Sequence, residues 1–239
     1  MKHFIYGTHS VQHALRNPQR TLYRLLTSTS AATMLNIGAG IPHDILEMGA
    51  MSRICGNDAV HQGVILYCDP LPQPNLGNLL KHLAKNKGAH TLLILDNLTD
   101  PQNIGAIVRT CAAFGVKGII CHDRQTPATE TPSLVKAACG ALEYVPITRV
   151  GNIAATQETL KENGYWCLGL SEHAQTTLDK VPTYEKLAVV MGSEGKGIRP
   201  QVLKNCDITA RIATNPNFPT LNVSVATAVT LSTLTLGHK

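Results

Sequence analysis

The chain has 239 residues, enough for one large domain or two modest ones with real hydrophobic cores. No apolar stretch approaches the roughly 20 residues that cross a bilayer, which argues against a membrane protein. The seven cysteines stand singly with no C-x-x-C pair, so reduced thiols in the cytoplasm are expected, with no disulfide framework and no metal site. Residues 1–90 carry eight Lys and Arg against four Asp and Glu, and this basic excess fits a polyanionic partner.

Residues 1–70 are predicted to form a small α/β module. The segment "FIYGTHSVQHALRN" (4–17) is typical of a short strand followed by an amphipathic helix, and "LYRLLTST" (22–29) of another strand. His9 and His13 stand four apart on the predicted helix, a spacing that two metal ligands can use. Because no acidic or cysteine partner is evident nearby, surface or RNA-facing histidines are the preferred interpretation.

A composition break follows at "DPLPQPNLG" (69–77), where three prolines alternate with other residues. Such a run has no regular hydrogen bonding and is typical of a linker. The next segment, "NLLKHLAKNKG" (78–88), predicts a helix that ends at Gly88 with lysines in its last turns.

From residue 91 on, short apolar runs alternate with helical segments. The predicted strands are "TLLILD" (91–96), "KGIIC" (117–121), "EYVPI" (143–147), "YWCLGL" (165–170) and "KLAVVMG" (186–192). The predicted helices are "NIGAIVRTCAAFG" (103–115), "PSLVKAACGA" (132–141) and "NIAATQETLKENG" (152–164). This alternation predicts a parallel sheet covered by helices on both faces. The last stretch, "LNVSVATAVTLSTLTL" (221–236), is rich in β-branched residues, but its length favours a buried helix.

The glycine-rich segment "MGSEGKGIRP" (191–200) follows the apolar run "LAVV". It is not a Walker loop, because Val190 and Gly197 occupy the places of the required glycine and Ser or Thr. Nor is it a dinucleotide fingerprint, because its glycine spacing differs and it follows the fifth predicted strand instead of the first. The sequence also contains no G-x-S-x-G elbow for a hydrolase.

Three segments taken in order resemble the motifs of the SpoU/TrmH branch of the SPOUT RNA methyltransferases. They are "LDNLTDPQNIGAIVRTCAAFGV" (95–116), "LAVVMGSEGKGIRP" (187–200) and "LNVSVATAVTL" (221–231), supported by "VKAACGALEYVPI" (135–147) and "YGTHSVQHAL" (6–15). The resemblance implies a parallel α/β sheet with a C-terminal trefoil knot, preceded by a small α/β RNA-binding domain. It also implies transfer of a methyl group from S-adenosylmethionine to a ribose 2′-hydroxyl of RNA. The expected boundaries are 1–70 for the RNA-binding domain, 71–90 for a linker and leading helix, and 91–239 for the knotted domain.

The resemblance assigns site residues by their place in the motifs. The catalytic candidates are Arg109, Asn103, Glu194, Asn222 and Thr220, and the cofactor-binding candidates are Gly192, Ile212, Leu221, Gly169 and Leu168. Arg109 is expected either to activate the 2′-hydroxyl or, because a guanidinium is a poor base, to hold the target phosphate and ribose electrostatically. Asn103 and Glu194 are expected to bond to one another or to the substrate and so fix Arg109.

Structural interpretations stand beside these roles. Arg109 could pair with Asp100 or Asp123, Glu194 could be a carboxylate favoured at a helix start, and Asn222 could be a helix N-cap. Ile212 and Leu221 could simply pack in the core. Two further residues, Lys196 and Arg199, are candidate phosphate contacts.

The chain departs from the family pattern at Ala213, where relatives usually have proline, and at Thr220, where serine is common. Pro216 and Pro219 are additional prolines in the same loop. The module followed by a proline linker resembles the subgroup that modifies a guanosine of large-subunit rRNA, so rRNA is favoured over tRNA as the substrate. A tRNA methyltransferase is the alternative, and a non-catalytic RNA-binding or ribosome-assembly protein is a further one. The uncharged final helix predicts a homodimer, because burying all its faces within one chain is difficult.

Overall fold

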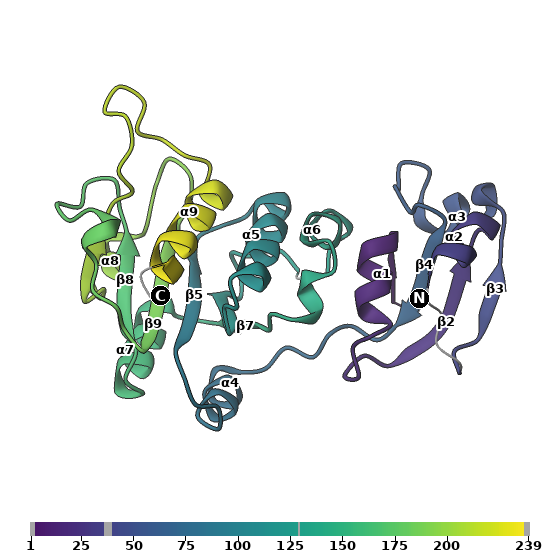
Figure 1. Ribbon diagram of the computed structural model, residues 1–239, viewed down its shortest axis with the longest axis horizontal. Helices are drawn as coiled ribbons and strands as arrows, with labels where there is room; N and C mark the ends of the chain where they lie inside the picture. Colours follow the sequence, from purple (N-terminus) through teal and green to yellow (C-terminus); the bar gives the residue numbers. More distant parts are fainter. Residues whose placement is uncertain (1–2, 36–39, 129, 237–239) are drawn as a thin grey trace.

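The computed structural model describes residues 3–35, 40–128 and 130–236. Two β-sheets lie side by side along the long axis of the molecule, each with its own helices (Figure 1). We call residues 3–68 the small domain and residues 76–236 the large domain. An extended segment joins them.

The small domain is a four-stranded mixed sheet in the order β1-β4-β2-β3. Its elements are β1 (Phe4–Tyr6), α1 (Thr8–Ala14), β2 (Leu22–Thr27), α2 (Thr29–Met34), β3 (His43–Ile45), α3 (Met48–Cys55) and β4 (Val64–Cys68). The predicted strand, helix and strand are confirmed as β1, α1 and β2. The elements β3, β4, α2 and α3 were not predicted, although β4 is the central strand that β1 and β2 flank in antiparallel pairing.

Helix α4 (Leu76–Leu83) follows the proline-rich segment and begins where the Asn75 side chain accepts a hydrogen bond from the Asn78 N–H. The helix ends five residues before Gly88, so its predicted end was wrong. Leu79 and Leu83 are its buried residues, and the exposed residues 84–89 that follow offer no apolar side chain larger than alanine to pack against the sheet. Lysines alone do not extend a helix that has nothing further to bury.

The large domain contains a parallel sheet of six strands in the order β10-β8-β9-β5-β6-β7. The strands are β5 (His90–Asp96), β6 (Gly118–His122), β7 (Ile147–Val150), β8 (Trp166–Leu170), β9 (Lys186–Gly192) and β10 (Ile208–Ala210). The expected parallel α/β fold is confirmed. The segment "EYVPI" was wrongly predicted as a strand, because residues 141–143 form a 3₁₀ turn (η1, Ala141–Glu143) and β7 begins only at Ile147.

Helices cover both faces of this sheet, as predicted. They are α5 (Pro101–Ala113), α6 (Pro132–Ala138), α7 (Ile153–Glu162), α8 (Pro200–Lys204), α9 (Val223–Leu236) and the 3₁₀ turn η2 (Leu178–Lys180). Alternate residues of β5 enter two different cores: Leu93 packs with α5 and α6, whereas Leu92 packs with α4 and α7. This alternation explains why β5 reads as one continuous apolar run.

The last segment of the chain is a helix, α9, as its length indicated. It packs against α5 and contacts β9 and η2. Among the described residues, no helix combines the length and apolar character that crossing a membrane requires.

A buried ion cluster joins the two domains. Arg20 of the small domain lies 2.7 Å from Glu130 and 2.7 Å from Glu143 of the large domain, with all three side chains less than a tenth exposed. Arg20 also donates to the Asp69 carbonyl at 2.8 Å. Burial alone would lower the pKa of the guanidinium, but the hydrogen bond to Glu143 and the charges of both carboxylates outweigh burial and raise it. The guanidinium of Arg20 is therefore held in its charged form.

Candidate active site

The site forms where the neighbouring strands β5 and β9 end. Asp96 and Gly192 are register partners at these carboxyl ends, the edge of a parallel α/β sheet where ligands usually bind. Asp96 is fully buried and accepts hydrogen bonds from the backbone N–H and the Nε of Arg199, both at 2.8 Å. A second guanidinium nitrogen of Arg199 lies 2.6 Å from the same carboxylate. Arg199 was expected to be a phosphate contact, and that role stays a prediction: its fork pairs with Asp96 and fastens the glycine loop to β5, while its side chain is 37% exposed.

Gly192 is required by the loop itself. A Cβ at this position would lie 2.1 Å from the carbonyl carbon of Gly197 and 2.2 Å from the Ile198 nitrogen. The loop returns onto β9 through Ser193, which exchanges backbone hydrogen bonds with Gly197 at 2.8 and 3.2 Å. Gly192 was expected to let backbone approach the cofactor. The structure places the chain's own loop in that space.

Glu194, at the tip of this loop, connects two helix starts. Its Oε1 accepts hydrogen bonds from Asn103 Nδ2 at 3.3 Å, from Asn222 Nδ2 at 2.7 Å and from the Val223 N–H at 3.2 Å. Asn222 Nδ2 also donates to Asn103 Oδ1 at 3.0 Å. Three candidates from three separate motifs thus form one cluster, which we call the Glu194 cluster.

The two asparagines of the cluster sit at helix starts, whereas Glu194 lies in the turn after β9. Asp100 caps α5 by accepting from the N–H groups of Gln102 and Asn103. Asn222 caps α9, because its Oδ1 accepts from the Ser224 N–H at 2.9 Å. The structural interpretation of Asn222 as an N-cap is therefore right, and its amide nitrogen still reaches Glu194. A carboxylate is favoured at helix starts, and Glu194 supplies it for both α5 and α9.

Arg109 lies apart from the Glu194 cluster. It is six residues beyond Asn103, which corresponds to about 9 Å along the axis and about 240° around it. Its side chain is exposed, and its Nη1 donates to the Cys139 sulfur at 3.6 Å. The expected hydrogen bond between Asn103 and Glu194 is present, whereas within the described residues neither of them bonds to Arg109, so their fixing of Arg109 stays a prediction. Nor does Arg109 pair with Asp100 or Asp123 within the described residues.

The expected cofactor residues fall into two groups. Ile212 and Leu221 flank the exposed loop that carries Thr220 and joins β10 to α9. Ile212 packs partly against the core, whereas Leu221 is exposed. Leu168 and Gly169 lie within β8, whose backbone pairs with β9 on one side and β10 on the other.

Gly169 has a packing reason of its own. A Cβ there would lie 2.8 Å from the Cys206 sulfur and 3.0 Å from Leu203 Cδ1, so the residue lets α8 approach the sheet. Leu168 is fully buried in the core. The structure brings neither residue to the Glu194 cluster.

One polar group beside Gly192 is without a partner. The Ser193 hydroxyl oxygen is buried and has no hydrogen-bond partner among the described residues. Sequence reasoning missed Ser193, because a serine in a glycine loop has no distinctive pattern. A buried unpaired hydroxyl is costly unless a ligand or water completes it. The Ser193 hydroxyl is therefore a further candidate for contact with the expected cofactor.

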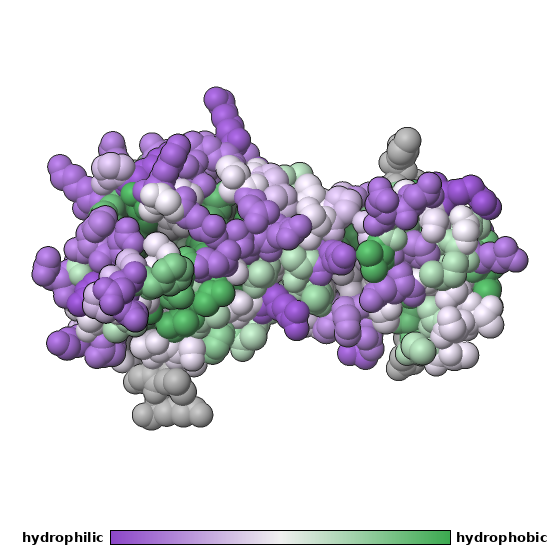
Figure 2. All heavy atoms as spheres, turned by 90° about the horizontal axis from the view of Figure 1, so that it is seen from above, coloured by the Kyte–Doolittle hydropathy of each residue, from purple (hydrophilic) through white to green (hydrophobic). Residues whose placement is uncertain are grey.

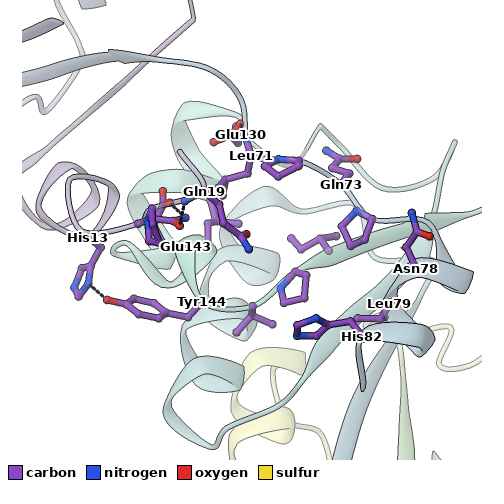
Figure 3. Close-up of a pocket in the computed structure, with 18 of the residues that line it drawn as sticks. His13, Gln19, Leu71, Gln73, Asn78, Leu79, His82, Glu130, Glu143 and Tyr144 are labelled. Carbon is purple, nitrogen blue, oxygen red and sulfur yellow. Dashed lines mark hydrogen bonds between the residues drawn. The ribbon is translucent and has the colours of Figure 1, made fainter. Parts of the chain in front are cut away.

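A separate cavity of about 770 Å³ lies between the domains (Figure 3). It is lined by the end of α1, the proline-rich segment, α4 and the residues that lead into β7. No residue of the Glu194 cluster lines this cavity. The cavity lies at the amino end of β7, whereas the cluster lies at the carboxyl ends of the parallel strands β5 and β9. His13, expected at the surface or facing RNA, here packs at the domain junction against Tyr144, with Nδ1 and Oη 2.8 Å apart. Among the described residues, no group of three or more potential metal ligands occurs.

Comparisons with known proteins bear on both domains. The SpoU rRNA Methylase family matches residues 90–232, and the family described as RNA 2′-O ribose methyltransferase substrate binding matches residues 4–74. The chain is 34% identical over 234 residues to the 23S rRNA (guanosine-2′-O-)-methyltransferase RlmB of Pseudomonas aeruginosa, covering 95% of this chain and 93% of that protein. It is 35% identical over 227 residues to an uncharacterized tRNA/rRNA methyltransferase of Synechocystis. That match covers 95% of the chain but only 56% of the longer protein.

The fold comparison agrees. The crystal structure of the SpoU methyltransferase AviRb from Streptomyces viridochromogenes, in complex with AdoMet, matches with a TM-score of 0.83 at 17% identity. The match covers 99% of this chain and 90% of that one, so both domains take part in it. At this identity the likeness concerns the fold.

Proposed function

The chain belongs to the SpoU rRNA methylase family and is an RNA ribose 2′-O-methyltransferase, and from this premise we propose that its target is a guanosine of large-subunit rRNA. The observation that carries the proposal is the relationship to the Pseudomonas enzyme, which extends over both domains at 34% identity. A tRNA methyltransferase remains the alternative. The match of residues 4–74 to a substrate-binding family favours a substrate held by the small domain as well as by the large one.

The proposed cofactor is S-adenosylmethionine, which supplies the methyl group. The AdoMet complex of the AviRb structure and the unpaired Ser193 hydroxyl support this choice. Ser193 and the segments at Ile212 and Leu221 would hold it, the last two through backbone groups. The backbone groups of Leu168 and Gly169 already form the pairing between β8 and β10. These two residues would therefore support the cofactor site through the sheet and would not bond to the cofactor.

In this proposal the Glu194 cluster connects the glycine loop to the starts of α5 and α9. Because Oε1 of Glu194 accepts three hydrogen bonds, its carboxylate fixes the starts of α5 and α9 relative to the glycine loop. Thr220, in the exposed loop just before Leu221, is placed to contact the RNA. Arg109 is exposed, and the nitrogens of its fork that do not donate to Cys139 would hold a phosphate and ribose. A cation beside the 2′-hydroxyl lowers the pKa of that hydroxyl and so favours its attack on the methyl group.

We further propose that the enzyme is a homodimer in the cytoplasm. Helix α9 buries Val223 and Leu231 but leaves Val225 48% and Val229 37% exposed, one turn apart on the same side. Figure 2 shows apolar side chains gathered on one part of the large domain, whereas polar ones cover most of the remaining surface. A second copy of α9 would cover these valines through a two-fold interface.

The trefoil knot is also a proposal. Its support is that α9 follows β10, at the edge of the sheet, yet packs on α5 beside the central strands. The chain must therefore cross back over the sheet between residues 210 and 223.

The test of the function compares two RNA substrates. Purified enzyme with labelled S-adenosylmethionine is offered transcripts of large-subunit rRNA and of tRNA, and the modified nucleotide is mapped by mass spectrometry. We expect 2′-O-methylguanosine in the rRNA. Preferential labelling of tRNA would overturn the choice of substrate, and an absence of labelling in every RNA would favour the non-catalytic alternative.

A further inference from the structure

Helices α5 and α6 touch most closely one turn before Arg109. A Cβ on Gly105 would lie 2.6 Å from the Ala137 Cβ and 2.6 Å from the Leu134 carbonyl oxygen. Residues four apart on a helix share a face, so the contact that brings α6 onto Gly105 also brings the end of α6 to Arg109. Arg109 is therefore placed by helix packing, and within the described residues neither Asn103 nor Glu194 bonds to it.

The turn that ends α6 has an unusual conformation. Cys139, directly after the helix, has a φ of 48°, a left-handed conformation that residues with a side chain seldom adopt. Its sulfur accepts the hydrogen bond from Arg109 Nη1 at 3.6 Å and lies 3.3 Å from the Lys136 carbonyl, to which the thiol donates. Such local strain persists only where the surroundings enforce it.

The next residue of the turn touches the small domain. Gly140 has a φ of 86°, and a Cβ on it would lie 2.4 Å from the Cδ2 and 2.9 Å from the Cβ of His13. Figure 3 shows His13 and Tyr144 pointing toward one another across the junction, and in Figure 1 α6 lies between α1 and α5. Two consecutive residues thus contact the catalytic candidate on one side and the small domain on the other.

We propose that this turn is a joint that couples docking of the small domain to the position of Arg109, with Cys139 as the positioning residue. The inference rests on the proposed function, in which the small domain carries RNA and Arg109 acts on it. While His13 packs against Gly140, the turn holds the Cys139 sulfur against the guanidinium of Arg109. When the domain is displaced, the turn loses its support and Arg109 is left without a fixed partner in the described structure.

The first experiment separates positioning from folding by means of Cys139. In Cys139→Ala, kcat is expected to fall roughly tenfold, the effect of losing one hydrogen bond to a charged group, while KM for RNA and the affinity for S-adenosylmethionine stay unchanged. Cys139→Ser keeps a hydrogen-bonding atom and is expected to restore kcat to within about twofold of the wild type. A wild-type kcat in Cys139→Ala overturns the proposal. An equal loss in both variants also overturns it, because the sulfur contact would then not be the cause.

The second experiment changes the contact between Gly140 and His13 at the domain junction. Gly140→Ala places a methyl group against His13 and is expected to lower kcat at least as far as Cys139→Ala does. Its matched control is Gly115→Ala, which carries the same strain at a φ of 69° but has no atom within 4 Å of the new methyl group. His13→Ala, which removes the ring without straining the backbone, is expected to lower kcat in the same way. If Gly115→Ala lowers kcat as much as Gly140→Ala, or His13→Ala leaves kcat unchanged, no coupling exists.

The third experiment needs no methyl transfer. Iodoacetamide labelling of the intact protein, mapped to Cys139 by mass spectrometry, is expected to be several times faster in His13→Ala than in the wild type, because loss of the imidazole leaves the turn without support and uncovers the thiol. Burial raises the pKa of the six other thiols, including Cys121, to about 11 for Cys55, Cys68 and Cys206 and about 12 for Cys111 and Cys167, which keeps their background low. An unchanged labelling rate in His13→Ala overturns the joint. A protein that methylates no RNA but shows the accelerated labelling would retain the joint and lose the proposed function.

Discussion

Replacing Arg20 by methionine tests how firmly the domains are joined. The change removes the cation between Glu130 and Glu143, whose side chains are only 8% and 3% exposed. Removing one partner of a buried ion pair costs roughly 3–5 kcal/mol, because the remaining charge is buried without compensation. Since two carboxylates are affected, we expect a loss of about 4–5 kcal/mol in the free energy of unfolding, the upper end of that range. Methionine retains most of the apolar volume, so little of the loss comes from an empty cavity.

The assay is urea unfolding followed by circular dichroism, with Arg24→Met as the matched control. Arg24 pairs with Asp44 at the surface, where their side chains are 56% and 40% exposed, and such pairs contribute about 0–1 kcal/mol. Adding Glu130→Gln and Glu143→Gln to Arg20→Met removes the uncompensated charges and is expected to recover most of the loss. A difference below about 1 kcal/mol between Arg20→Met and Arg24→Met would show that the reasoning about the cluster is wrong.

The other predictions concern the loop, the dimer and pH. Gly192→Ala should destabilise the protein by about 3 kcal/mol or more in urea unfolding, because its methyl group meets backbone, whereas Gly49→Ala, in open space on α3, should be neutral. Val225→Asp or Val229→Asp should abolish both dimerisation, measured by sedimentation, and methyl transfer; a wild-type monomer of full activity would contradict this. Burial and then nearby lysines lower the pKa of His90, so its unfolded state binds more protons and stability should decline as pH falls below about 6.5. His90→Phe should flatten that decline in unfolding midpoints compared at about pH 5.5 and 7.5, and an equally steep decline would assign the effect to other groups.

Local pattern was sufficient for the central strands of the large domain's sheet, but it missed the edge strand β10 and was insufficient for the small domain. In β5 both faces are buried, so the continuous apolar run and the helices around it identified a covered parallel strand. The strand β3 has three residues and an exposed isoleucine at its end, which leaves little pattern to detect. The segment "EYVPI" was wrongly predicted as a strand, because it lies between the end of a 3₁₀ turn and the start of β7.

The candidate site could be predicted in its parts but not in its connections. The order of the motifs placed Asn103, Glu194 and Asn222 together, and the structure joins them by hydrogen bonds. The pair of Asp96 and Arg199 spans 103 positions, a separation at which no periodicity or spacing rule applies. A carboxylate at the end of the apolar run "TLLILD" was the one available signal, because a buried charge requires a partner. Only the tertiary structure identified that partner.

Gly192 shows why a glycine alone does not identify a ligand. Close approach of a cofactor and close approach of the chain to itself both require the absence of a Cβ, so the sequence pattern is the same for either. Here the atoms that occupy the space belong to Gly197 and Ile198, and the return of the loop brings Glu194 toward the starts of α5 and α9. The structural role of the glycine therefore runs through the loop: it allows the turn, the turn places the Glu194 carboxylate, and the carboxylate bonds to the starts of two helices. Under the proposed function, the Ser193 hydroxyl, which is buried and unpaired among the described residues, is the group of this loop that we expect to contact the cofactor.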